Sequence, residues 1–89
     1  MPVTREDSIA VADAFVRERQ WTDCWSHKRL SVREAQHERS GRDCWLVWCH
    51  SGGVLPPRET QVWVVVAEGT VRRATRVMGR ALPEIYEAG

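Results

Sequence analysis

The sequence predicts an α+β domain in which one N-terminal amphipathic helix packs on a four-stranded antiparallel sheet, followed by a short C-terminal helix. Three observations predict this fold. A capped amphipathic segment opens near Thr4, apolar tryptophan-bearing segments follow at Cys44–Cys49 and Gln61–Ala67, and glycine-containing turns punctuate the second half. With 89 residues, we expect a single domain over residues 1–89 with one modest core.

The first predicted element is a helix from Thr4 to Gln20 or Trp21. Thr4 and Asp7 form a weakened capping box, with Asp where Glu is more usual. The negative charges of the first turn also favour the helix dipole. One face is apolar over an arc of about 160°, and it contains Ile9, Val11, Ala12, Phe15 and Val16.

The next two predicted elements form a hairpin. Leu30 and Val32 alternate with polar residues, which favours a half-exposed strand, although residues 33–38 could also be helical by propensity. Ser40-Gly41 then provides a turn. In Cys44–Cys49 both faces of the strand are apolar, so we expect both to be covered.

The second half of the chain predicts two more strands and a closing helix. Residues 51–58 contain two glycines and a Pro-Pro pair, which favour a loop. The third strand, Gln61–Ala67, turns at Glu68-Gly69 into a fourth strand over Thr70–Val77. Leu82–Glu87 has Pro83 near its start, which predicts a short C-terminal helix.

The charge balance argues against two classes of partner. There are 13 Lys and Arg against 12 Asp and Glu, whereas proteins that bind nucleic acids or membrane surfaces usually carry a clear basic excess. No apolar run reaches the roughly 18 residues of a membrane span. Three cysteines without framework spacing favour a reducing compartment. We therefore expect a cytoplasmic protein with no nucleic-acid or membrane partner.

A protein partner would need exposed anchors. Most of the five tryptophans are expected in the core, because each ring buries roughly 150–250 Å². Trp21 and Trp25, beside the predicted helix end, are candidate exposed anchors. Arg72, Arg73 and Arg76 form either a solvated strand face or a surface for an anionic partner.

Metal-binding and catalytic sites are not predicted. Five possible soft or borderline ligands are present: Cys24, His27, Cys44, Cys49 and His50. Cys49 and His50 are adjacent, and Cys44 and Cys49 are five apart, so in a strand each pair points to opposite faces. A catalytic set could be drawn from Cys49, a histidine and Asp43, but such residues occur in most chains of this composition. We expect no enzyme activity, no metal and no cofactor.

The order of these segments resembles the YrhB-like family, which includes the thirty-fifth immunity-protein class of bacterial polymorphic-toxin systems. The segments that carry the resemblance are Thr4–Asp7 opening into Ile9–Val16, then Gly41–Trp48, Val62–Ala67, Glu68–Val71 and Leu82–Tyr86. The resemblance implies a small α+β protein that binds and neutralises a cognate toxin, or a chaperone-like relative. It transfers no catalytic residue.

Other classes of function stay open at this point. A single helix on a sheet also suits a cystatin-like or propeptide-like inhibitory or regulatory module, and a small enzyme or zinc protein is less favoured. The expected partner is a protein, possibly a toxin. The chain itself is expected to be a monomer or a homodimer paired through an edge strand.

Overall fold

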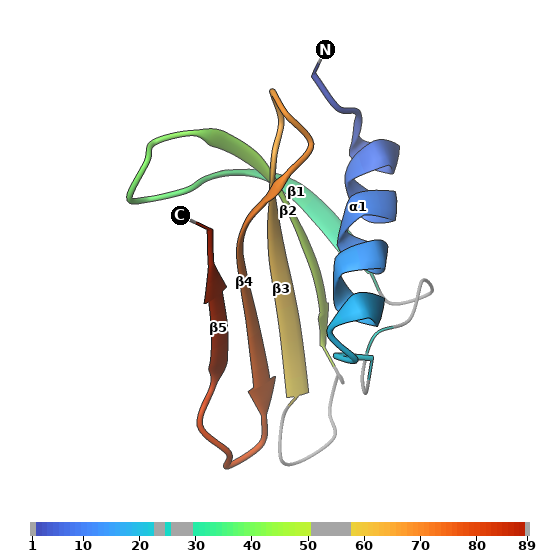
Figure 1. Cartoon of the computed structure of the whole chain (residues 1–89), viewed down its shortest axis with the longest axis vertical. Coiled ribbons are helices and arrows are strands. Elements are labelled where there is room, and N and C mark those ends of the chain that lie inside the picture. The colour runs from blue at the N-terminus through green and yellow to red at the C-terminus, as the bar shows by residue number, and fades with distance from the viewer. Residues whose placement is uncertain (1, 23–24, 26–29, 51–57, 89) are drawn as a thin grey trace.

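The described residues form one helix and a five-stranded antiparallel sheet (Figure 1). The computed structural model describes residues 2–22, 25, 30–50 and 58–88. The helix and the first two strands are α1 (Arg5–Glu18), β1 (Ser31–Gln36) and β2 (Asp43–His50). The remaining strands are β3 (Arg58–Val65), β4 (Val71–Met78) and β5 (Glu84–Glu87). Neighbours in sequence are neighbours in the sheet, in the order β1-β2-β3-β4-β5.

The predicted α+β class with an N-terminal helix is confirmed. The capping box is present, because the Asp7 backbone N–H donates to Thr4 Oγ1 (3.1 Å) and the Thr4 N–H donates to Asp7 Oδ2 (3.2 Å). Ala12 and Val16 of the predicted apolar face are fully buried. The helical reading of residues 33–38 is excluded for residues 33–36, which belong to β1. The predicted loop at residues 51–58 lies almost entirely outside the described residues.

The predicted short helix at Leu82–Glu87 is wrong, and so is the count of four strands. Glu84–Glu87 pair antiparallel with β4, where Ala74 lies opposite Tyr86. A segment this short cannot sustain a helix without tertiary support. The outer edge of β4 supplies backbone partners to an extended chain instead, and propensity is overridden by that pairing.

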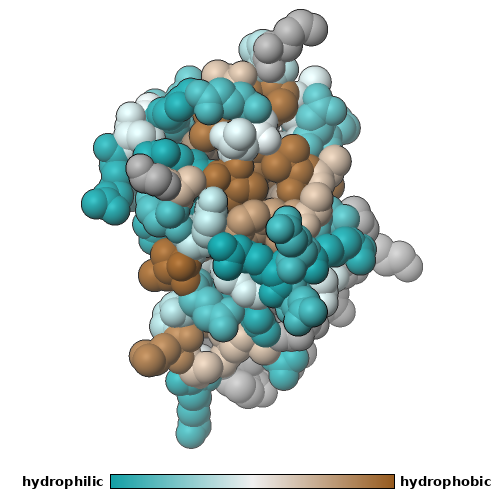
Figure 2. All heavy atoms as spheres, viewed as in Figure 1, coloured by the Kyte–Doolittle hydropathy of each residue, from teal (hydrophilic) through white to brown (hydrophobic). Residues whose placement is uncertain are grey.

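The core lies between α1 and one face of the sheet. Val47, Val62 and Ala74 stand opposite one another on β2, β3 and β4, and all three are fully buried against the helix. We call this side the helix face. Figure 2 shows apolar side chains gathered between α1 and the sheet, with hydrophilic side chains around them.

Aromatic contacts join the end of the helix to β5. The helix is followed by Gln20 in a left-handed conformation (φ 62°). Phe15 packs edge-on against Tyr86 with a centroid distance of 5.0 Å. The Arg19 guanidinium lies 4.5 Å from the Tyr86 ring centroid and within 5.4 Å of the Phe15 and Trp21 centroids. This cation–π cluster holds the last strand against the helix.

A β-bulge in the β3–β4 pair changes which way one arginine points. Trp63 pairs with Arg73 and Val64 pairs with Val71, so Arg72 is the extra residue. Bulges increase the local twist of a sheet. The sheet is strongly twisted, and the β1–β2 hairpin reaches across toward the C-terminal end of β5 (Figure 1).

The turn glycine Gly69 provides a test of the contact between the N-terminal segment and the β3–β4 turn. Gly69 has φ +69°, and a Cβ built there would lie 2.7 Å from Val3 Cγ1. Gly41 has nearly the same φ, +68°, with no atom within 4 Å. Gly41→Ala should therefore cost about 1–2 kcal/mol from backbone conformation alone. Gly69→Ala should cost roughly a further 1–3 kcal/mol from overpacking.

Chemical denaturation of both variants measures the difference. Adding Val3→Ala to Gly69→Ala should bring the loss close to that of Gly41→Ala, once the cost of Val3→Ala alone is subtracted. Equal losses for the two glycine variants would contradict the Val3 contact.

Candidate functional site

The side of the sheet opposite the helix, which we call the open face, carries one continuous row of side chains across all five strands. Register places Arg33 of β1 opposite Leu46, Leu46 opposite Trp63, and Trp63 opposite Arg73. Arg73 in turn lies opposite Glu87 of β5. The helix does not cover this side.

Two tryptophans on this face are half-buried, each near an arginine. Trp48 and Trp63 lie on adjacent strands, diagonal to each other. The Arg33 guanidinium lies 5.2 Å from the Trp48 ring centroid, and the Arg73 guanidinium lies 5.6 Å from the Trp63 ring centroid. Cation–π contacts of this kind are worth about 0.5–1 kcal/mol at exposed sites, so they orient both partners.

The three arginines predicted as one partner surface do not share a face. Arg73 lies on the open face. Arg76 follows Ala74 on the helix face, where its Nη1 lies 3.3 Å from Glu84 Oε2. Arg72 occupies the bulge, and its Nε is buried without a hydrogen-bond partner. An alternating strand cannot present residues 72, 73 and 76 together.

The two predicted tryptophan anchors lie beside the helix. Trp21 is 6% exposed and belongs to the core, so it is not an accessible anchor. Trp25 is half-buried, and its indole N–H donates to Asp13 Oδ1 at 3.0 Å. Both rings therefore contact the end or the side of α1.

A buried histidine joins the β1–β2 loop to β5 at one end of the open face. His37, in the β1–β2 loop, is 2% exposed. Its Nδ1 accepts the Ser40 backbone N–H (3.2 Å) and lies 2.8 Å from Ser40 Oγ. Nε2 therefore carries the proton and donates to Glu87 Oε1 of β5 at 2.6 Å. We call these three residues the clasp, because they connect the first hairpin to the last strand.

The clasp has the residue types of a hydrolytic triad but not its setting. A triad needs a nucleophile beside a space for substrate and donors for the developing oxyanion. In the described part of the chain, Ser40 is not among the residues that line the three cavities of about 390, 180 and 270 Å³. Its Oγ also accepts the Arg42 backbone N–H at 3.4 Å. The arrangement satisfies buried polar groups, as a structural network does.

The clasp also lowers the pKa of a carboxyl group. The hydrogen bond from His37 lowers the pKa of Glu87 below its usual range, and the charges of Arg73 and Arg39 act in the same direction. Arg73 Nη1 lies 3.3 Å from Glu87 Oε2. Glu87 is thus held ionised between a histidine of the hairpin and an arginine of β4.

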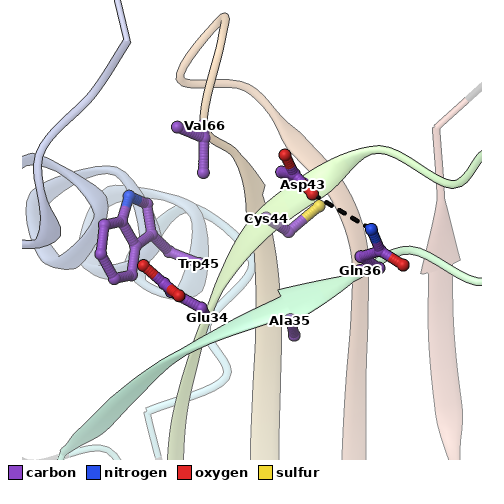
Figure 3. Close-up of a pocket in the computed structure, with 7 residues that line it drawn as sticks. All are labelled: Glu34, Ala35, Gln36, Asp43, Cys44, Trp45 and Val66. Carbon is purple, nitrogen blue, oxygen red and sulfur yellow. Dashed lines mark hydrogen bonds between the residues drawn. The ribbon is translucent and has the colours of Figure 1, made fainter.

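A cavity of about 390 Å³ lies along the β1–β2 hairpin near Val66 (Figure 3). Figure 3 shows Glu34 and Trp45 on one side, with Gln36 donating to Asp43 on the other. Cys44 is the nucleophilic side chain among the lining residues. Burial raises the pKa of the Cys44 thiol, and the thiol lies 3.6 Å from the Arg42 carbonyl oxygen. A protonated, buried thiol is not an activated nucleophile.

Two of the candidate metal ligands, Cys44 and Cys49, lie on opposite faces of β2. Cys44 belongs to the open face and Cys49 to the helix face, as expected from their spacing, and both are buried thiols that are not joined in a disulfide. Among the described residues, no group of three or more His, Cys, Asp or Glu side chains could hold a metal ion. Cys24 and His27 lie outside the described residues.

Comparison with known proteins adds no relative. No protein-family model matches the chain, and neither the curated proteins nor the solved structures include a significant match. The resemblance to the YrhB-like family therefore rests on the sequence motifs alone. In the described residues, no helix is long and apolar enough to cross a membrane.

Sequence reasoning did not find the clasp or the tryptophan pair as a site. His37 and Glu87 are 50 positions apart, and their contact depends on the curvature of the hairpin. Trp48 and Trp63 could have been assigned to one face from strand alternation together with the correct register. The signal in the sequence was that the arginines and tryptophans occupy alternate positions of their strands, which places them on one face when the strands are in register.

The clasp predicts a specific dependence of stability on pH. The folded-state pKa of Glu87 is lowered from 4.5. Its stabilising contribution is therefore present above about pH 4.5 and is lost as the pH falls through the folded-state pKa. In Glu87→Gln, the fall in melting temperature between about pH 4.5 and pH 3 should be smaller than in the unmodified protein.

The matched control is Glu84→Gln, which removes a more exposed carboxylate from the same strand. This variant should keep the acid-side slope of the unmodified protein. If Glu87→Gln and Glu84→Gln give the same slope, Glu87 does not supply the linkage.

Proposed function

We propose that this chain is a small non-enzymatic binding protein of the immunity type, which neutralises a cognate bacterial toxin by covering part of its surface. One observation carries the proposal. The open face presents two half-buried tryptophans, each oriented by an arginine, on a rigid antiparallel sheet. These contacts are already made in the unbound chain.

The residue types of this face are those of an interface centre. Tryptophan and arginine are the residues most enriched among those that dominate binding energy. Trp48 and Trp63 are neither fully buried nor fully exposed, so each keeps ring surface that a partner can cover. Little side-chain entropy is lost on binding when a side chain is already held in place.

The charges of the face favour an acidic partner. Arg33 is exposed on β1, and Arg73 retains 36% side-chain exposure despite its ion pair with Glu87. Complementary charge raises association rates and excludes wrong partners. A toxin that binds nucleic acid through a cationic site would not fit here, whereas a toxin with an acidic rim around its site would.

The non-enzymatic part of the proposal is supported by the chemistry of the described residues. The buried Cys44 thiol has a raised pKa. The Ser40–His37–Glu87 clasp is used to connect two strands. Cys44 lines a cavity but as a protonated thiol, and Ser40 lines none of the three cavities described above, so neither residue is placed as an activated nucleophile.

The proposal is tested with the product of the gene immediately upstream. Expression of that product alone should arrest growth, and co-expression of this chain should restore it. Isothermal titration should then give a direct interaction between the two purified proteins. A neighbouring product that is not toxic, or a toxin that does not bind, contradicts the proposal; a biosynthetic neighbour would favour an accessory module.

Substitutions on the open face should weaken that interaction. Trp48→Ala and Arg33→Glu are each expected to cost at least about 2 kcal/mol of binding, or roughly a 30-fold rise in Kd. The reason is the loss of a central ring and the reversal of a charge facing an acidic surface. Melting temperatures measured in parallel separate binding from folding.

Arg17→Glu is the matched control, because Arg17 is 61% exposed on the helix. It makes the same charge change away from the open face and should leave Kd within about twofold. Arg73→Glu should weaken binding more than Arg76→Glu, since Arg73 lies on the open face and Arg76 lies on the helix face. If the four charge reversals, at Arg17, Arg33, Arg73 and Arg76, weaken binding equally, the interface does not lie on the open face.

A further inference from the structure

We infer that the space enclosed by the β1–β2 loop, the β4 bulge and the end of β5 is a binding site for a carboxylate group. This inference does not depend on the toxin role, because it follows from the cavity and is tested without a partner protein. We call the space the clasp cavity. It has a volume of about 270 Å³ and is lined by His37, Arg39, Arg72, Glu87 and Ala88.

The clasp cavity continues toward the open face. A second cavity, of about 180 Å³, shares His37 and Arg39 with it and is also lined by Trp63 and Arg73. A ligand with a carboxylate in the clasp cavity could therefore extend its remaining atoms over the Trp63 ring. This geometry suits a carboxylate at the end of a short apolar chain, such as an acidic side chain.

The fold places Arg72 at the cavity for a structural reason. Arg72 is the extra residue of the bulge, so it does not alternate with its neighbours as a regular strand residue would. Its Nε is buried and has no hydrogen-bond partner. A buried donor without an acceptor is destabilising. A small shift of the guanidinium toward an oxyanion in the cavity would supply that acceptor.

The charges around the two cavities favour a single negative charge. Arg39, Arg72 and Arg73 are balanced in part by Glu38 and Glu87, which leaves one positive charge in excess. Glu87 is already engaged by His37 and Arg73. A monoanionic carboxylate would neutralise the excess, and a planar carboxylate can accept two parallel N–H bonds from one guanidinium. A phosphate dianion would leave a net negative charge beside Glu87.

The experiment is an NMR titration of the complete chain at pH 7 and constant ionic strength. The first probe is N-acetyl-glutamate amide, and its matched neutral control is N-acetyl-glutamine amide. Succinate and inorganic phosphate are titrated separately. The expected result is saturable movement of the Arg72 Nε–H and Ala88 backbone N–H signals with the glutamate probe, and at least a tenfold weaker response with the glutamine probe.

Two variants locate the site. Arg72→Gln and Arg39→Gln should each weaken glutamate-probe binding at least fivefold, whereas Arg33→Gln, on β1 of the open face, should not. Arg39 is exposed, so its variant remains informative if Arg72→Gln does not fold. A free dicarboxylate that binds as tightly as the probe supports the site and identifies a small-molecule source.

Three results would overturn the inference. The first is equal binding of the glutamate and glutamine probes, which would show that the carboxylate is not recognised. The second is tighter binding of phosphate than of either carboxylate. The third is a response in Arg72→Gln and Arg39→Gln that matches the unmodified protein.

Discussion

A five-stranded sheet with a single helix has one face that the helix cannot reach, and this molecule covers part of that face with its own first hairpin. The need for such cover is set by the apolar residues there: Leu46 and Val65 point away from the helix yet are 3% and 2% exposed. A chain of 89 residues buries only about 60–65% of its unfolded surface, so burial on this second face is a substantial part of the core. The clasp, the two connected cavities and the partial exposure of Trp63 all follow from the curvature of that hairpin.

The hydrogen bond between His37 and Glu87 is the point at which the curvature is fixed. It joins the loop after β1 to the strand at the opposite edge of the sheet. Loss of this contact would free the hairpin to move away from β4 and β5, exposing apolar side chains and opening the clasp cavity. Arg73 contacts both Trp63 and Glu87, so it joins the open face to the clasp.

The elements with strong local signals were predicted from the sequence, and those that depend on tertiary pairing were not. The capped helix and the strand at Cys44–Cys49 have regular apolar patterns, and the structure has both. β5 was predicted as a helix, because four residues after a proline carry little local information and the edge of β4 decides their conformation. The clasp was missed for a related reason, since its partners meet only after the sheet has curved. Arg72, Arg73 and Arg76 do not share a face, because Arg73 and Arg76 are three positions apart on an alternating strand and Arg72 occupies the bulge.

The first strand has a consequence for self-association. In the described part of the chain β1 forms one edge of the sheet. Two copies that pair antiparallel about a two-fold axis normal to the sheet place the central residue of each strand opposite itself. In β1 that residue is either Arg33 or Glu34, the middle of Ser31–Gln36. Either register sets two like charges face to face at the centre of the new ladder, which disfavours pairing. The edge nearest the proposed binding surface is in this way protected from extension of the sheet by its own copies.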